Sequence, residues 1–405
     1  MAVTQAYSFA DLFAFTRATA GWSFDAAGAL AETAAGSVRA DYDPATLAFR
    51  GLLIEGEAAN SIINPRCEGA AAPSTKPTGW GFIGGPSLTA TYSAPIIEAG
   101  VPCVDITISG TTSNSNGVQI VFNVAGTNGP NAAVGEQWTG SAYIRLLSGS
   151  LPGAPSINLA EYASTVYQAG SFSPITVDGV LRRQNGSRIL TDPDTTTVQF
   201  GLQWAVASGV AVNFTVRVGA PQFEKQPSAT SPILPAPGTP GASTRNADGL
   251  SMTSIARWFN PVAGTFVMDF MPGQAAAPAD RDLLMIDDGT AANRLRLRML
   301  PGDTTVRLGV TNGGVGSAAL NAASGAALVR HTARFSYGPA GHFLSVNGAA
   351  PVSHTAAVPG GLTRVLVGNS GGANYLNGWI GPRLDYFPTQ YTDTVAADGF
   401  TIRTR

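Results

Sequence analysis

"VQFGLQWAV", residues 198–206, alternates large apolar side chains with polar or small ones at a period of two. Its large apolar residues are Val198, Phe200, Leu202 and Trp204. They share one face of a strand, because successive side chains of a strand point to opposite sides of the sheet. We predict that Trp204 lies in a hydrophobic core. A strand with one buried face is typical of an antiparallel sheet.

Similar strand patterns recur on both sides of this stretch, between residues 66 and 225. Examples are "SLTATYSA", "CVDITISG", "GVQIVFNVAG", "GSAYIRLLSG" and "VAVNFTVRVGAPQFE". Each is bounded by Gly, Asn, Ser or Pro, and no helical period separates them. Six or more strands at this spacing predict a β-sandwich of the jelly-roll type.

A second series of strands occupies residues 249–405, with "GTFVMDFMPG", "NRLRLRML", "VRHTARFSYG" and "GHFLSVNGAAP" as its clearest members. It predicts a second antiparallel sandwich. Between the two, residues 226–248 are rich in Pro, Gly, Ser and Thr, and we expect a semi-rigid linker there. The chain is therefore expected to be all-β.

The N-terminal residues 1–65 indicate a small β-meander that cannot bury enough apolar area by itself. Its last strand contains Leu52, Leu53 and Ile54 with no polar alternation. Both faces of that strand should therefore be covered. We expect it to attach to a second subunit or to a larger assembly.

Composition excludes several functions. The net charge is −2, so no overall positive field favours nucleic acid. No apolar run reaches the length of a transmembrane span, and no secretory signal is visible, so we expect a cytoplasmic product. The two cysteines, Cys67 and Cys103, either pair or remain as buried thiols.

Three stretches together resemble structural proteins of bacteriophages and gene-transfer-agent-like particles. "FTRATAGWSFDAAGALAETAAGSVRADYDPATLAFRGLLIEGEAANSIINP" is similar to the segment that precedes carbohydrate-binding modules in those proteins. "GAPQFEKQPSATSPILP" resembles the last strand of such a module, and "YLNGWIGPRLDYFPTQYTD" the closing strand of laminin-G or concanavalin-A-like lectin domains. The sequence "AANSII" departs from the usual family motif after "GLLIE".

This resemblance implies a head spike, fibre or tail-fibre protein on the surface of a virion or phage-like particle, assembled in the bacterial cytoplasm. It implies adsorption to host capsular polysaccharide, contacts with other particle proteins through residues 1–65, and a homo-oligomer, either trimer or pentamer. Neither a collagen-like repeat nor a heptad repeat is visible, which favours a compact spike. Two alternatives are a glycan-degrading tailspike and a decoration protein without a ligand.

Sugar binding requires flat aromatic faces and planar polar groups. In the first sandwich Trp80, Tyr162 and Tyr167 lie in loop-like sequence, where an exposed aromatic has fewer structural explanations. We predict them as sugar platforms. The alternative is that they belong to the core or its rim.

In the second sandwich the alternation of "NRLRLRML" places three arginines opposite its apolar face. The predicted basic patch consists of Arg294, Arg296, Arg298, Arg307 and Arg334. Such a patch suits carboxylates or sulfates of an acidic polysaccharide. The alternative is a solvated outer face whose arginines deter aggregation.

No catalytic or metal-binding motif is visible. The three histidines lack metal-ligand spacing, and no nucleophile motif is present. Loops around Asp287 and Asp288 suit a Ca²⁺ ion, but turn formation explains them equally well. A glycosidase requires two carboxylates, for which Asp287, Asp288, Asp385 and Glu161 are candidates. We expect a binding protein rather than an enzyme.

Overall fold

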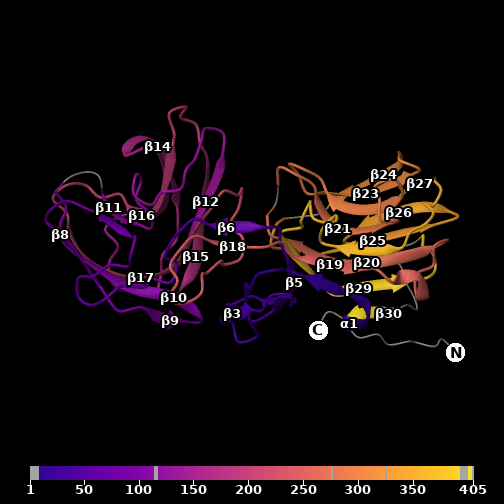
Figure 1. Cartoon of the computed structure of the whole chain (residues 1–405), viewed down its shortest axis with the longest axis horizontal. Helices are drawn as coiled ribbons and strands as arrows, with labels where there is room; N and C mark the ends of the chain where they lie inside the picture. Colours follow the sequence, from indigo (N-terminus) through magenta and orange to yellow (C-terminus); the bar gives the residue numbers. More distant parts are fainter. Residues whose placement is uncertain (1–8, 114–116, 275–276, 324–325, 393–399, 404–405) are drawn as a thin grey trace. The chain divides into compact units, whose positions relative to one another are not determined.

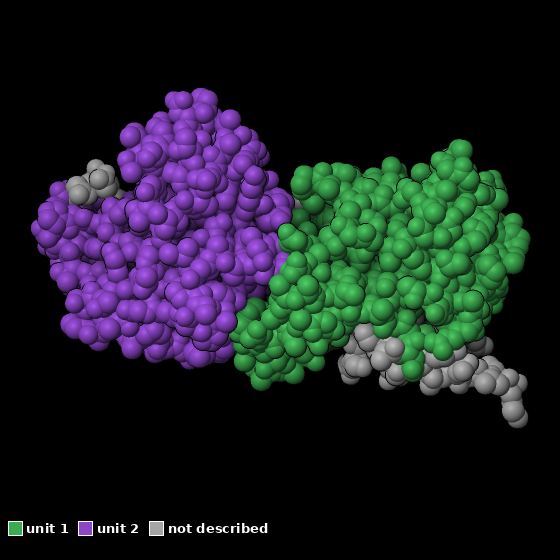
Figure 2. All heavy atoms as spheres, viewed as in Figure 1, with its two compact units in different colours: residues 1–57, 246–405 green, residues 58–245 purple. Residues whose placement is uncertain are grey.

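The computed structural model describes residues 9–113, 117–274, 277–323, 326–392 and 400–403. Its strands form two compact units, traced along the chain in Figure 1 and coloured separately in Figure 2. Unit 1 combines residues 1–57 with residues 246–405, and unit 2 consists of residues 58–245. This division differs from the predicted one, because the N-terminal segment shares a unit with the C-terminal sandwich.

Unit 2 contains two antiparallel sheets and a short ribbon. One sheet has the order β14 (Val166–Pro174), β13 (Pro155–Ala163), β16 (Thr197–Trp204), β11 (Val118–Val121), β7 (Gly81–Ile83). The other has the order β15 (Arg182–Ile189), β12 (Gln137–Gly149), β17 (Ala211–Glu224), β10 (Val101–Thr111), β8 (Leu88–Tyr92), with β9 (Ile96–Glu98) also paired to β10. The ribbon consists of β6 (Ala58–Asn60) and β18 (Ser243–Arg245).

Aromatic side chains join the two sheets of unit 2. Phe200 of β16 lies 5.5 Å from Phe223 of β17, measured between ring centroids. Trp204 is fully buried beside Phe214, as predicted. Replacing such a side chain with alanine typically costs about 3 to 5 kcal/mol. The predicted antiparallel sandwich is therefore confirmed for this part of the chain.

The predicted linker is largely a bound part of unit 2. Its first residues cross the outer side of the β15–β8 sheet, where the Thr139 hydroxyl donates to the carbonyl of Gln226. The Thr230 amide and hydroxyl both donate to the Glu224 carboxylate. Ile233 is buried, and its amide donates to the Gln222 side chain at 2.7 Å. This segment is bound to the polar outer face of a β-sheet. Its Pro-rich composition did not indicate that it would be bound.

Unit 1 also contains two antiparallel sheets. One has the order β1 (Ala14–Thr16), β19 (Gly249–Met252), β28 (Arg364–Val367), β21 (Arg281–Asp287), β22 (Arg294–Met299), β23 (Thr305–Asn312), β24 (Val315–Ala323). The other has the order β27 (Val352–His354), β26 (Gly341–Val346), β25 (His331–Gly338), β20 (Gly264–Pro272), β29 (Gly378–Phe387), β5 (Phe49–Ile54), β4 (Ala40–Tyr42), with β30 (Phe400–Arg403) also paired to β29. Short elements are α1 (Phe9–Leu12), the 3₁₀ turn η1 (Ile255–Arg257), and the hairpin of β2 (Gly21–Phe24) and β3 (Leu30–Thr33).

The two sheets of unit 1 enclose one core. Leu295 and Leu297 of β22 belong to the same buried cluster as Phe266 of β20. Phe266 stacks on Phe335 of β25 with ring centroids 5.2 Å apart. These contacts confirm the second antiparallel sandwich.

The strand predicted to attach to another molecule is enclosed by its own chain. β5 pairs with β29 on one side and β4 on the other, and Leu52, Leu53 and Ile54 are all buried. Gly51 has a φ of 133°, and a Cβ there would lie 2.5 Å from the carbonyl oxygen of Ile380. Only glycine therefore allows this close approach of β5 to β29. The expectation that this strand needs an outside partner was wrong, because its partner follows more than 300 residues later in the chain.

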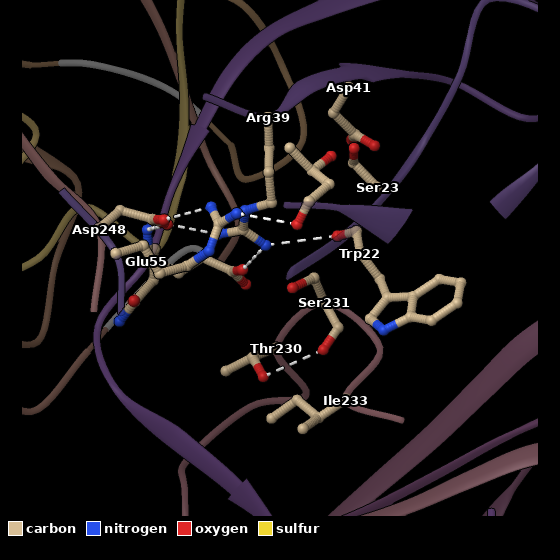
Figure 3. A network of polar contacts seen from close by, with 12 residues as sticks. Trp22, Ser23, Arg39, Asp41, Glu55, Thr230, Ser231, Ile233 and Asp248 are labelled. Carbon is tan, nitrogen blue, oxygen red and sulfur yellow. Dashed lines mark hydrogen bonds and ion pairs between the residues drawn. The ribbon is translucent and has the colours of Figure 1, made fainter. Parts of the chain in front are cut away.

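A buried ionic cluster fixes the N-terminal segment within unit 1 (Figure 3). Arg39 contacts both Glu55, at 2.8 Å, and Asp248. Arg17 contacts Asp248 at 3.1 Å, and the Asp248 amide donates to the Glu55 carbonyl. Burial alone would lower the pKa of the Arg39 guanidinium, but Glu55 and Asp248 outweigh it and raise that pKa. The cluster therefore links the N-terminal part of unit 1, which ends at residue 57, to its C-terminal part, which begins at residue 246.

Candidate functional site

Tyr162 and Tyr167, two of the predicted sugar platforms, lie side by side in unit 2. They face each other across the β13–β14 pair, with ring centroids 5.8 Å apart and planes nearly perpendicular. Tyr167 is 54% exposed. A Cβ at Gly170 would lie 2.9 Å from the Tyr167 hydroxyl oxygen, so the missing side chain leaves room for the tyrosine.

Trp80, the third predicted platform, is buried. Its indole N–H donates to the Asn64 carbonyl at 3.1 Å, and its ring meets Phe122 edge-on at 4.8 Å. The prediction of an exposed ring was wrong. The segment before β7 is anchored by this tryptophan, which belongs to the core of unit 2.

The tyrosines border an outer sheet face, which we call the amide face. Along β13 and β16, Ile157, Leu159, Phe200 and Leu202 point into the core. The residues between them, and those paired with them on the other strands, point outward. The amide face comprises Ile83, Gln119, Val121, Ser156, Asn158, Ala160, Tyr162, Tyr167, Gly170, Phe172, Thr197, Gln199, Gly201 and Gln203.

Carboxamide side chains occupy the middle of this face. Asn158 Nδ2 donates to Gln203 Oε1 at 2.9 Å and to Gln119 Oε1 at 3.2 Å. Asn158 is 7% exposed, and its buried carbonyl oxygen has no hydrogen-bond partner among the described residues. Gln199 accepts from the Ala125 amide at 3.2 Å. Buried polar groups are usually paired, so the oxygen of Asn158 is available to accept a hydrogen bond from a water or from a ligand group.

Aromatic rings flank the amides. Phe172 is directly opposite Asn158 in the register and is 52% exposed. Burial and the neighbouring Tyr167 raise the pKa of the Tyr162 phenol, and a hydrogen bond with Gln199 opposes them. Tyr162 therefore stays protonated at neutral pH. Among the described strand residues that point to this face, none is Asp, Glu, Lys or Arg.

The structure places the predicted arginine patch beside carboxylates. Arg294, Arg296 and Arg298 do lie opposite the apolar face of β22, and Arg298 is paired with Arg307 of β23. Arg296, however, forms two hydrogen bonds with Asp282, at 2.6 and 2.9 Å. Asp280 contacts both Arg296 and Arg298 at 3.1 Å. The expected basic field is therefore largely neutralised.

The remaining arginines of that patch do not complete it. Arg307 donates to the Asn321 side chain at 2.7 Å. Arg334 lies on β25, which belongs to the other sheet of unit 1, so it is no neighbour of the β22 arginines. The alternative of a polar outer sheet face describes these residues better than an anion-binding patch.

The acidic residues considered for calcium or catalysis have local partners. Asp287 pairs with Arg364, and Asp288 accepts from Thr290 and from Asn293, at 2.8 Å. Over the described ranges, no group of three or more His, Cys, Asp or Glu is arranged to hold a metal ion. Asp385 contacts Arg383. We assign no cation site to these loops.

Glu161 lies on the core side of β13 and is saturated with donors. Arg188 Nε donates to it at 2.6 Å, the Thr195 hydroxyl at 2.8 Å and the Asp192 amide at 3.1 Å. Burial would raise its pKa, but these hydrogen bonds outweigh burial and lower it. As a carboxylate, the residue stabilises the loop after β15.

Both cysteines of unit 2 are free and buried. Burial raises the pKa of the Cys103 thiol to about 12, and it raises that of Cys67 as well, with the neighbouring Cys103 adding to the effect. The thiols therefore remain protonated and poorly nucleophilic at neutral pH.

The part of the chain that the structure describes contains no helix with the length and apolar character that a membrane span requires.

Sequence reasoning missed Phe172 and all four amides, Gln119, Asn158, Gln199 and Gln203. Part of the signal was present in "SINLAEY" and "VQFGLQW", where Asn158, Gln199 and Gln203 stand between core positions. The partner strand of each, and hence the convergence of these amides, becomes visible only in the sheet order.

No family model and no curated protein matches the chain. Solved structures with a partly similar fold include the CBM22-1 xylan-binding domain of Paenibacillus barcinonensis Xyn10C, at 14% identity and a TM-score of 0.26, over 43% of this chain and 94% of that one. Domains LG4-5 of the mouse laminin α1 chain align at 12% identity and 0.26, over 67% and 86%. Trypanosoma rangeli sialidase aligns at 11% and 0.27, over 96% and 78%. At these values the alignments carry no functional argument.

Proposed function

We propose that unit 2 binds polysaccharide on the amide face and does not cleave it. The observation that carries the proposal is the pair of the half-buried Tyr162 and the exposed Tyr167 beside a cluster of amides on one outer sheet face. Aromatic rings cover the C–H surfaces of sugars, and carboxamides pair with their hydroxyl groups. A sheet face of this kind suits several sugar units of a chain.

The absence of cleavage is part of the proposal. Among the residues described on the amide face there is no carboxylate, whereas glycoside hydrolysis ordinarily uses two. Glu161 points to the other side of the sheet and is occupied by Arg188 and the loop that follows β15. Incubating the protein with a bound polysaccharide should leave the viscosity unchanged. A steady fall in viscosity would favour the glycan-degrading alternative.

The binding test uses the full chain in native gels that contain single soluble polysaccharides, including capsular polysaccharide. We expect retardation of the wild type by at least one of them. Replacing both rings, as Tyr162→Ala with Tyr167→Ala, should lower the affinity about five- to 150-fold, because each ring is expected to contribute about 0.5 to 1.5 kcal/mol.

Val166→Ala is the matched control for that test. Val166 is exposed on the same hairpin but is not a residue of the amide face. Its variant should migrate like the wild type. Equal retardation of the double tyrosine variant and the wild type would contradict the proposed site.

The proposal extends to the setting of the protein: the surface of a virion or phage-like particle assembled in the bacterial cytoplasm, where it promotes adsorption to host capsular polysaccharide as a trimer or pentamer. The support for this part is the resemblance of residues 15–65. Light scattering of the purified chain tests the oligomer. Deleting its coding sequence should reduce particle adsorption to capsulated cells, and unchanged adsorption would favour a decoration role without a ligand.

A further inference from the structure

The hydrogen-bond polarity of the amide face is set by a network of three amides with Asn158 at its centre. Asn158 has two N–H hydrogens, and they are donated to the carbonyl oxygens of Gln203 and Gln119. Turning its amide over would bring three carbonyl oxygens together, which is repulsive. The orientation of Asn158 is therefore fixed by its two neighbours on β16 and β11.

This orientation determines what the glutamines offer. Their carbonyl oxygens point to Asn158, so the N–H₂ group of Gln203 is directed away from it as a donor. Gln203 is partly exposed, whereas Asn158 lies below it with an unused carbonyl oxygen. The cluster thus combines donors at the surface with one acceptor beneath them. Hydroxyl groups match both, because a hydroxyl donates and accepts.

A carboxylate does not match this arrangement. It accepts only, so it leaves the Asn158 oxygen unpaired, and the two would repel each other. The described strand residues of this face supply no arginine or lysine to compensate a buried negative charge.

We infer that the amide face selects uncharged, hydroxyl-rich sugar chains and rejects chains rich in uronic acid, and that Asn158 is the positioning residue for this choice. The inference rests on the proposed function and names the substrate class of the same site. It replaces the expectation of an acidic polysaccharide, which depended on the arginine patch.

The first experiment compares neutral polysaccharides (soluble β-glucan, xylan and galactomannan) with acidic ones (alginate and polygalacturonate) in native affinity gels of the full chain. We expect retardation by a neutral polysaccharide, with less than a twofold change between 50 and 500 mM NaCl. Retardation by acidic polysaccharides alone, or a tenfold loss with salt, would overturn the inference but leave polysaccharide binding standing. No retardation by any polysaccharide would overturn both.

The second experiment inverts the polarity. In Asn158→Asp the new carboxylate accepts only, so Gln203 and Gln119 must turn their N–H₂ groups inward and present oxygens. We expect at least a tenfold loss of affinity for the neutral polysaccharide at pH 7. Part of the affinity should return when the pH is lowered far enough to protonate the new carboxyl group, a response that a merely structural role would not produce.

Gln203→Glu tests the same inference if Asn158→Asp does not fold. Gln203→Glu keeps the bond from Asn158 and strengthens it, but removes the N–H₂ donor. It should lose affinity to a similar extent with an unchanged unfolding temperature. Val166→Ala, exposed on the β13–β14 hairpin but outside the amide face, is again the control and should bind like the wild type. Wild-type affinity in Gln203→Glu would overturn the role of the donor.

Discussion

Two outer sheet faces of this protein carry rows of polar side chains and differ in whether those side chains satisfy one another. On β22 of unit 1, Arg296 and Arg298 meet Asp280 and Asp282. On the amide face of unit 2, Asn158 keeps an acceptor without a partner in the described structure. The charges of the first face are paired with each other, whereas the second face carries no charge and keeps an unused acceptor among the described residues.

This contrast shows why charge alone is a poor guide to a binding site. A row of arginines in a sequence suggests an anion-binding site, but a buried or half-buried arginine requires a carboxylate, and here the fold supplies it. Amides give a weaker signal in a sequence. They remain neutral in any orientation, so a fold tolerates one unpaired amide oxygen far better than one unpaired charge.

The largest effect on stability is expected when a carboxylate is removed from the arginines of β22 in unit 1. Asp282→Ala leaves Arg296, which is 8% exposed, without its bidentate partner. We expect a loss of about 3 kcal/mol in the unfolding free energy of unit 1, because removing one member of a buried pair strands the other. Urea denaturation measures it. Asp280→Ala, at the more exposed end of the cluster, should cost about 1 kcal/mol or less, and equal losses in the two variants would contradict the distinction.

A smaller effect is expected from the ionic site on the inner side of the amide sheet. Because the pKa of Glu161 is lowered in the folded protein, its contribution is present above the ordinary glutamate pKa and is lost as the pH falls through the folded value. Glu161→Gln should cost about 2 kcal/mol at pH 7. It should also flatten the decline of unit 2 stability as the pH falls below the ordinary glutamate pKa.

Tryptophan fluorescence during denaturation at several pH values measures the decline of stability with falling pH, with the wild type as reference. The variant should decline less steeply than the wild type. A variant that declines with acid as steeply as the wild type would show that Glu161 does not carry the acid sensitivity of unit 2.

The smallest effect is expected on the arginine row. Arg307 is bound to Asn321 at the surface, so Arg307→Gln should change the unfolding free energy by less than about 0.5 kcal/mol. It should leave polysaccharide retardation unchanged, since the proposed site is in the other unit. A loss of retardation would return the arginine row to consideration as a sugar site.

Local periodicity predicted much of the fold and part of the site. Trp204 and the apolar faces of β16 and β22 follow from a period of two, and they are buried as expected. Tyr162 and Tyr167, which belong to the proposed site, were predicted from loop-like sequence, but the structure places them on β13 and β14. Strand order was not accessible: Asn158 meets Gln119 only because β16 lies between β13 and β11.

Long-range pairing accounts for the main errors. Leu52 to Ile54 required two covered faces, which was correct, but the covering residues lie far along the chain: Leu52 and Ile54 belong to the core of unit 1, and Leu53 packs with Met271 and Trp379. The side chain of Arg296 was placed on the correct face, but the bulge in β21 that brings Asp282 beside it has no signature in the sequence. A sequence shows which side chains need partners more readily than it shows which residues provide them.

The interrupted unit 1 has a consequence for biosynthesis. Residues 49–54 leave the ribosome early, yet β29, against which they pair, begins at residue 378. At about 5 to 20 residues per second the nascent strand waits on the order of tens of seconds. Unit 2, whose residues are contiguous, is complete well before then. The nascent chain therefore carries a finished domain while an apolar edge remains open, and it is during translation, rather than in the mature protein, that this strand is most in need of a chaperone.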